Sequence, residues 1–218
     1  MADTTTHAPV AIGGLDEEPG HGHHTTLGVS NEKLGMWVFL ASDCLLFGAL
    51  ISTFILYKDR VPPGQGPTPN DVYDIPFTSI SSFVLLMSSL TMVLAVAAIG
   101  RGDQRRTRTW LVATALLGAV FISGQVYEFT SFYREGMGYT KNVASSAFFS
   151  LTGFHGVHVS VGIIMLMSLF VMSLRGRLPT ERAETVEIIG LYWHFVDIVW
   201  IVIFTVVYLI PTENPVGL

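Results

Sequence analysis

The sequence has few charged residues and almost no cysteine. Only 13% of its 218 residues are charged, and Cys44 is its single cysteine. One cysteine excludes an intrachain disulfide, so cysteine usage does not indicate a redox compartment. The 12 Lys and Arg residues show no cluster of the kind that a nucleic-acid-binding face needs, and we expect no nucleic-acid partner.

The first 32 residues also lack features that would direct secretion. They contain neither Lys nor Arg and no apolar core, so we expect no secretory signal peptide. The segment is polar, acidic and glycine-rich, with histidines at His21, His23 and His24. A histidine-rich tract can bind a metal ion, but in a polar tail it is more often a solvated linker. We therefore predict a polar, disordered tail over residues 1–32.

Apolar residues dominate the rest of the chain. Half of all residues are hydrophobic, and long apolar runs recur along the sequence. A helix needs about 20 apolar residues to cross a bilayer, and each run reaches that length. The five expected membrane segments are Lys33–Tyr57, Phe77–Ile99, Arg108–Phe132, Ser145–Leu174 and Val186–Ile210. We predict an all-α fold, an integral membrane bundle of five transmembrane helices over residues 33–211, followed by a short external tail at 212–218.

Basic residues are distributed unevenly between the two ends of these segments. The end that holds the N-terminus has eight, namely Lys33, Arg101, Arg105, Arg106, Arg108, Arg175, Arg177 and Arg182. The opposite end has four, namely Lys58, Arg60, Arg134 and Lys141. Because Lys and Arg are enriched in cytoplasmic loops, we predict a cytoplasmic N-terminus and an external C-terminus.

The stretch from Tyr192 to Trp200 is unusual because it places His194 and Asp197 inside an apolar run. A charged group at the centre of a membrane helix costs about 2.5–3.5 kcal/mol on insertion scales, so such groups need partners within the protein. The spacing of three puts both side chains on one helix face. We predict that they form a polar network with His155 and His158, which packs the fourth and fifth helices together.

Asp43 is a second ionisable residue in an apolar run. It is expected about 15 Å from the cytoplasmic end of its helix, in the same middle layer as His155 and Asp197. Glu128, in contrast, is expected near the outer face. The immediate sequence neighbours of Asp43 offer no charge partner, so we expect its carboxyl to be protonated.

These residues leave three kinds of function open. The first is a metal site, because the H-x-x-H and H-x-x-D spacings and a glutamate superficially resemble di-iron carboxylate bundles. Such bundles carry paired E-x-x-H motifs, and this sequence has none. The second is a proton-coupled transporter with Asp43 as carrier, although repeated halves and broken helices are absent from the sequence. The third is a packing network, which the pattern favours, with no metal bound.

Four motifs resemble one family. They are G-M-W-V-F-L-A-S-D at Gly35–Asp43, G-Q-V-Y-E-F at Gly124–Phe129, A-F-F-S-L-T-G-F-H-G-V-H-V at Ala147–Val159 and L-Y-W-H-F-V-D-I-V-W at Leu191–Trp200. In this order and spacing the chain resembles subunit III of the haem–copper respiratory oxidases (cytochrome c or quinol oxidase), in its short five-helix bacterial form. The resemblance runs from about residue 34 to residue 210.

The resemblance implies a non-catalytic subunit of a proton-pumping terminal oxidase in the bacterial plasma membrane, within the aerobic electron transport chain. Haem and copper are then expected in partner subunits, and this chain is expected to carry no redox centre. Oxidase subunit I is the expected main contact, with subunit II and a small subunit IV as further partners. Phospholipid is expected as a bound component, and support of proton uptake by the neighbour as a role.

The resemblance also implies roles for single residues. Asp43 occupies the family position that reacts with carbodiimide, where many cytochrome c oxidase members have glutamate. Glu187 matches a family glutamate, but the histidines often found just upstream are here Arg182 and Ala183. The further residues that match family motifs are Trp37, Glu128, Glu187, Trp193 and Trp200.

Overall fold

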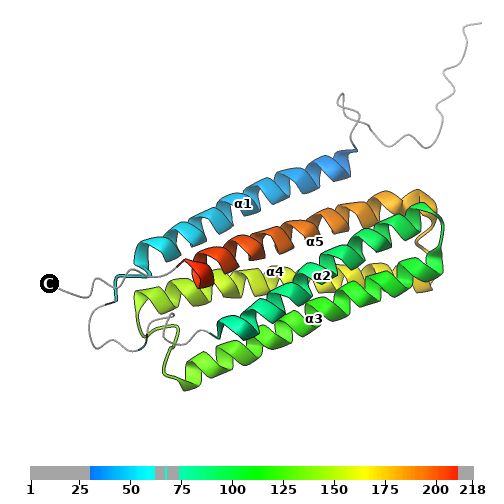
Figure 1. Cartoon of the computed structure of the whole chain (residues 1–218). Coiled ribbons are helices and arrows are strands. Elements are labelled where there is room, and N and C mark those ends of the chain that lie inside the picture. Colours follow the sequence, from blue (N-terminus) through cyan, green and yellow to red (C-terminus); the bar gives the residue numbers. More distant parts are fainter. Residues whose placement is uncertain (1–29, 62–66, 68–73, 211–218) are drawn as a thin grey trace, which may run out of the picture.

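A computed structural model describes residues 30–61, residue 67 and residues 74–210 (Figure 1). It contains five long helices, which are α1 (Asn31–Tyr57), α2 (Ile75–Gly100), α3 (Gln104–Arg134), α4 (Val143–Leu174) and α5 (Ala183–Phe204). A short 3₁₀-helix, η2 (Thr180–Arg182), precedes α5, and a π-helical turn, η3 (Thr205–Leu209), follows it. The described part of the chain contains no strand. The predicted all-α bundle of five membrane-spanning helices is therefore confirmed. Of the expected tails, residues 1–32 and 212–218, the structure describes only residues 30–32, where Ser30 caps α1 and Asn31 and Glu32 already belong to it.

Four of the helices begin at a side-chain cap that the sequence encodes. Ser30, Asp74, Asp103 and Asn142 each accept a hydrogen bond from the backbone N–H three residues further along. Such caps satisfy one of the four free N–H groups at a helix start. Because of its cap, α3 begins at Gln104, four residues before the expected membrane segment. Apolar composition marks only the part of a helix inside the lipid, and the capped turn extends beyond it.

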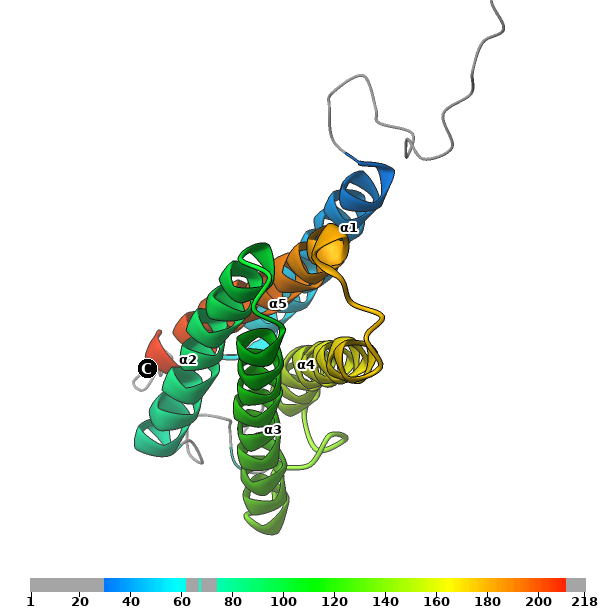
Figure 2. The same cartoon turned by 90° about the vertical axis from the view of Figure 1, so that its right-hand side faces the viewer.

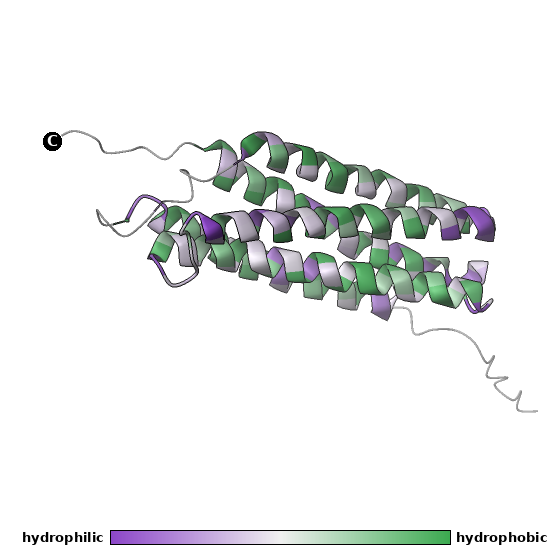
Figure 3. Ribbon diagram, turned by 90° about the horizontal axis from the view of Figure 1, so that it is seen from below, coloured by the Kyte–Doolittle hydropathy of each residue, from purple (hydrophilic) through white to green (hydrophobic). Residues whose placement is uncertain are grey.

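Helices α2 to α5 surround a common core, and α1 lies outside this group (Figures 1 and 2). The main neighbours of α1 are α4 and α5, whereas α5 also packs against α2. Hydrophilic residues gather in the connections and at the helix ends, and apolar residues follow the lengths of the helices (Figure 3). Outward-facing side chains such as Leu45, Ile80 and Ile164 are more than half exposed, as suits contact with lipid tails.

The indole of Trp193 lies at the centre of the four-helix group. A Cβ atom on Gly118 of α3 would lie 2.6 Å from its Cη2, and one on Gly162 of α4 would lie 2.8 Å from its Cε3 and Cζ3. Its Nε1–H donates to Ser88 Oγ of α2 at 3.0 Å. One side chain of α5 therefore contacts the other three helices, and two glycines make the space that it fills.

Candidate functional site

Asp43 of α1 is buried and faces His158 of α4. The distance from Asp43 Oδ2 to His158 Nε2 is 3.4 Å, and Oδ2 has no hydrogen-bond partner among the described residues. His158 Nδ1 lies 2.7 Å from the Phe154 carbonyl, which can only accept, so Nδ1 carries the proton. Nε2 is then the ring nitrogen that faces the Asp43 carboxyl.

The imidazole that faces Asp43 does not come from its sequence neighbours, which were expected to offer no charge partner. Ser42 donates instead to the Phe39 carbonyl of its own helix at 2.6 Å, and Cys44 is exposed. The imidazole near Asp43 comes from α4, which is distant in the sequence and adjacent in the fold. The Phe47 ring packs edge-on against this imidazole, with the ring centres 5.0 Å apart. The Asp43–His158 pair is thus a polar contact between α1 and α4.

His155 is fully buried and joins α4 to α5. Its Nε2 lies 3.2 Å from the Val196 carbonyl, so this nitrogen carries the proton, and no described residue hydrogen-bonds to Nδ1. Aromatic rings surround the imidazole: Trp200 lies 4.7 Å and Phe121 5.8 Å from it, measured between ring centres. A hydroxyl from Tyr192 adds a second link between these helices, because it donates to the His158 carbonyl at 2.9 Å.

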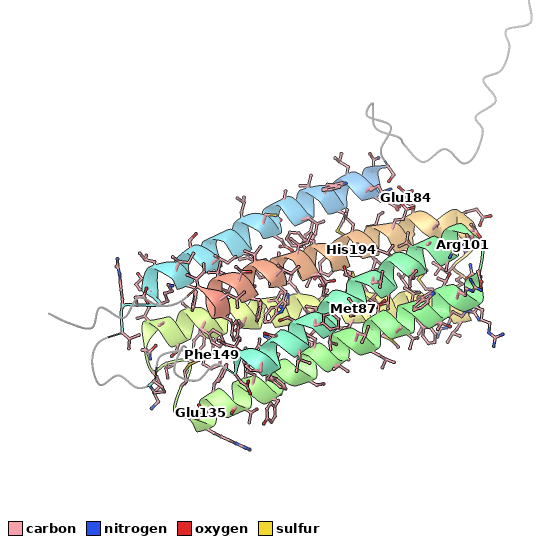
Figure 4. All side chains as sticks on the ribbon, in the orientation of Figure 1. Met87, Arg101, Glu135, Phe149, Glu184 and His194 are labelled. Carbon is pink, nitrogen blue, oxygen red and sulfur yellow. The ribbon has the colours of Figure 1, made fainter. Side chains whose placement is uncertain are left out.

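A row of serines on α2 receives three side chains of α5. His194 Nδ1 lies 2.6 Å from Ser89 Oγ (Figure 4 labels His194 on α5). Trp193 binds Ser88, as described above, and Trp200 Nε1–H donates to Ser82 Oγ at 2.9 Å. This row places the indole and imidazole groups of α5 against α2.

Asp197 belongs to the same helix, α5, as these indole and imidazole groups. It is 3% exposed, and neither of its carboxyl oxygens makes a hydrogen bond to a described residue.

The four predicted network residues therefore lie on the buried side of the bundle but do not bind one another. His155 contacts α5, His158 faces α1, and His194 contacts α2. Helical spacing indicated which residues share a face, but it did not indicate which helix each face meets. Among the described residues, no group of three His, Cys, Asp or Glu side chains is placed to hold a metal ion. The histidines of residues 21–24 lie outside the described residues.

The remaining motif residues lie nearer the helix ends. Glu128 is buried and accepts hydrogen bonds from Thr78 Oγ1 at 2.6 Å and from the Tyr208 hydroxyl at 3.3 Å. Glu187 pairs with Lys33 Nζ at 2.9 Å, which ties the start of α5 to the start of α1. Trp37 is 55% exposed on α1. Sequence reasoning missed Gly118 and Gly162, although a glycine within an apolar helix is a signal of close packing.

The motifs, the five membrane-spanning helices and the buried polar residues belong to one known architecture. The family described as cytochrome c oxidase subunit III matches residues 15–211. The chain belongs to the subunit III family. The match includes all five helices, so the alternative of a stand-alone transporter is not supported.

Relatives in the subunit III family include proteins with both kinds of electron donor in their names. Cytochrome c oxidase subunit 3 of Bacillus sp. is 36% identical over 186 residues, which is 85% of this chain and 89% of that protein. Cytochrome bo(3) ubiquinol oxidase subunit 3 of Pseudomonas aeruginosa is 35% identical over 193 residues, 88% of this chain and 91% of that protein. Quinol oxidase subunit 3 of Bacillus subtilis is 36% identical over 81% of this chain and 85% of its own length. The similarity is thus to the subunit III family and not to one donor class.

Proposed function

We propose that this chain is a non-catalytic subunit of a proton-pumping terminal oxidase, which passes electrons from cytochrome c or quinol to oxygen. The observation that carries the proposal is the subunit III family match across all five helices. Haem and copper are carried by partner subunits, and this chain holds no redox centre. In this role the chain stabilises oxidase subunit I, its main contact, and meets subunit II and a small subunit IV.

The hydrogen bonds of the buried histidines support a structural role for them. One ring nitrogen of each is already engaged, His155 with Val196, His158 with Phe154 and His194 with Ser89. A metal site would also need further ligands beside each remaining ring nitrogen, and no group of three His, Cys, Asp or Glu side chains among the described residues supplies them. The contacts of His155 with Val196 and of His194 with Ser89 join α5 to its neighbours.

We also propose that phospholipid binds to the groove between α1, α2 and α5. This groove has a volume of about 400 Å³, and its walls are apolar apart from Lys33, Glu187 and His194. Trp37 lies at the same end as the Lys33–Glu187 pair. Tryptophan is enriched at the level of lipid headgroups, so an acyl chain fits the apolar wall while a headgroup meets the ion pair.

The proposed location is the bacterial plasma membrane, with the N-terminus in the cytoplasm and the C-terminus outside. The excess of basic residues at the end that holds the start of α1 supports this orientation. In it, Asp43 and His158 lie within the membrane on the side of α1 and α4, where the pair supports proton uptake by the neighbouring subunit.

Purification of the tagged full-length chain in a mild detergent tests the main proposal. A haem-bearing partner should elute with the chain, and haem and copper should follow the partner when the two are separated in a harsher detergent. Haem or copper that stays with the isolated chain would overturn the assignment of redox centres to the partners. A chain that elutes from mild detergent without any haem-bearing polypeptide would overturn the proposed role as an oxidase subunit.

A further inference from the structure

Two connections at the end of the bundle where α1 begins carry a large positive charge. Residues 101–108 lead from α2 into the first turn of α3, and residues 175–182 lead from α4 to α5. Together they contain seven arginines and two acidic residues, which gives a formal net charge of +5. The two connections touch, because Gln104 Nε2 donates to the Leu178 carbonyl at 2.8 Å. They therefore form one surface, which we call the arginine face.

Most arginines of this face have no acidic partner among the described residues. Arg106 Nε lies 3.2 Å from Asp103 Oδ2, and Arg108 donates to Ser173 of α4. No described carboxylate forms an ion pair with the other five, which are all exposed: Arg101, Arg105, Arg175, Arg177 and Arg182. Arg105 lies in the first turn of α3, where the helix dipole already disfavours a cation. Uncompensated positive charge at a helix start makes this a surface that attracts anions.

The sequence that precedes α1 has the opposite charge. Residues 1–29 contain four acidic residues and neither Lys nor Arg, and three of the acids are consecutive at 16–18. This sequence joins the described chain beside the arginine face, because Ser30 donates a hydrogen bond to Glu184, two residues after Arg182. Figure 4 shows Glu184 and Arg101 at the same end of the bundle. Complementary charges therefore belong to neighbouring parts of one chain.

We propose that the acidic segment Asp16–Glu18 docks on the arginine face of its own chain. Glu18 precedes Ser30 by 12 residues, a length that can span up to about 40 Å, whereas a helix is about 10 Å wide, so the segment can reach across the end of the bundle. Tethering holds the segment at a local concentration in the millimolar range. An anionic lipid headgroup carries similar charge, but its acyl chains hold it at the rim of the face. The inference goes beyond the proposed function, because it does not depend on which subunits surround this chain.

Photo-cross-linking in membranes that contain the full-length chain tests the occupant. Benzoylphenylalanine replaces Leu15, next to the acidic segment, and mass spectrometry of the digested chain locates the adducts. We expect intrachain adducts within residues 101–108 or 175–182. Their yield should fall in salt of about 1 M, where the Debye length shrinks from about 8 Å to about 3 Å. Adducts with lipid or with another polypeptide in place of these would overturn the proposal.

The matched control keeps the probe at position 15 and neutralises the segment in the triple variant Asp16→Asn, Glu17→Gln and Glu18→Gln. The shape of the side chains is retained and only their charge is lost. We expect the adducts with the arginine face to disappear. An adduct yield that survives this change would show that charge does not hold the segment in place and would overturn the proposal.

The reactivity of the face gives an independent measure. With Cys44 replaced by Ser, Arg177→Cys reacts with an uncharged, water-soluble maleimide in the purified full-length protein. Neutralising the acidic segment should raise this rate about fivefold, the ratio expected if the segment covers the face about four-fifths of the time. Arg134→Cys, exposed at the opposite end, is the control and should react at one rate in both backgrounds. Equal rates at position 177 would overturn the inference. Neither readout uses haem, so the proposed function is tested separately.

Discussion

Among single residues, Trp193 has the most consequential position, because its indole meets α2, α3 and α4 together. The side chain is 1% exposed, so its whole surface takes part in packing. Protein interiors are dense enough that a single added methyl group is felt. The two glycines beside the indole are therefore as important to the bundle as the tryptophan itself.

Gly162→Ala should destabilise the chain, because the new methyl group would lie 2.8 Å from two atoms of a rigid ring. Overpacking of this kind costs about 1–3 kcal/mol. The measurement is the midpoint of thermal unfolding in detergent. Gly35→Ala is the matched control, since a Cβ there meets nothing within 4 Å and its midpoint should stay the same or rise. Equal midpoints for both variants would contradict the packing argument.

Asp43 should be the carboxyl that a hydrophobic carbodiimide modifies. Carbodiimides attack the protonated acid, and no described residue hydrogen-bonds to Asp43 Oδ2, which faces the His158 imidazole. Glu128 should be spared, because hydroxyls of Thr78 and Tyr208 already bind it. Mass spectrometry of digested, labelled complex locates the adduct. Labelling at Glu128 in place of Asp43 would show that the assignment is wrong.

Asp43→Asn should leave the initial rate of oxygen reduction near normal, because under the proposed function the redox centres belong to partner subunits. If Asp43 supports proton uptake or stability of the neighbour, activity should decay faster during turnover than in the unaltered complex. An oxygen electrode records both quantities in one experiment. An immediate loss of the initial rate, with haem content unchanged, would contradict a supporting role.

The residues of the candidate site could be named from the sequence, but their partners could not. Ionisable side chains stand out within apolar runs, which is why Asp43, His155, His194 and Asp197 were identified. The helix that each side chain meets depends on how the helices pack. That packing depends in turn on residues such as Gly118 and Gly162, which leave space for a neighbouring side chain. A pattern along one helix contains no information about its neighbour's rotation.

At the scale of elements, α5 is attached to α2 by three side-chain hydrogen bonds to serines. Hydrogen bonds between membrane helices contribute about 0.6 kcal/mol on average and up to about 1.7 kcal/mol. Each bond alone therefore adds little stability. The three together fix the rotation of α5 relative to α2. The helices themselves were predictable, because apolar length and N-terminal caps are local properties of the sequence.

His194→Leu should weaken retention of this chain in the complex under detergent without changing the haem spectrum. The substitution removes the contact with Ser89 and leaves the hydroxyl without its present partner on α5. The ratio of this chain to haem after purification measures retention. Ile201→Leu, at an exposed position on the same helix, is a suitable control. A changed haem spectrum with assembly intact would indicate a role in cofactor chemistry.

For the whole molecule, the distribution of charge predicts the orientation in the membrane. With Cys44 replaced by Ser, single cysteines at Arg101 and Arg134 probe the two ends of the bundle, because both positions are exposed. A membrane-impermeant maleimide added to intact cells should label Arg134→Cys and spare Arg101→Cys, which should react only after lysis. The reverse pattern would place the N-terminus outside.

The central position of Trp193 also bears on how the chain is synthesised. A ribosome delivers the helices in sequence order, and the indole that contacts α2, α3 and α4 is on α5, which is delivered after these three. Until then, Ser88 lacks its indole partner and the space beside Gly118 and Gly162 stays unfilled by protein. The contact that joins α2, α3 and α4 at this position therefore forms only after α5 has been synthesised, and a chain that stops before residue 193 lacks it.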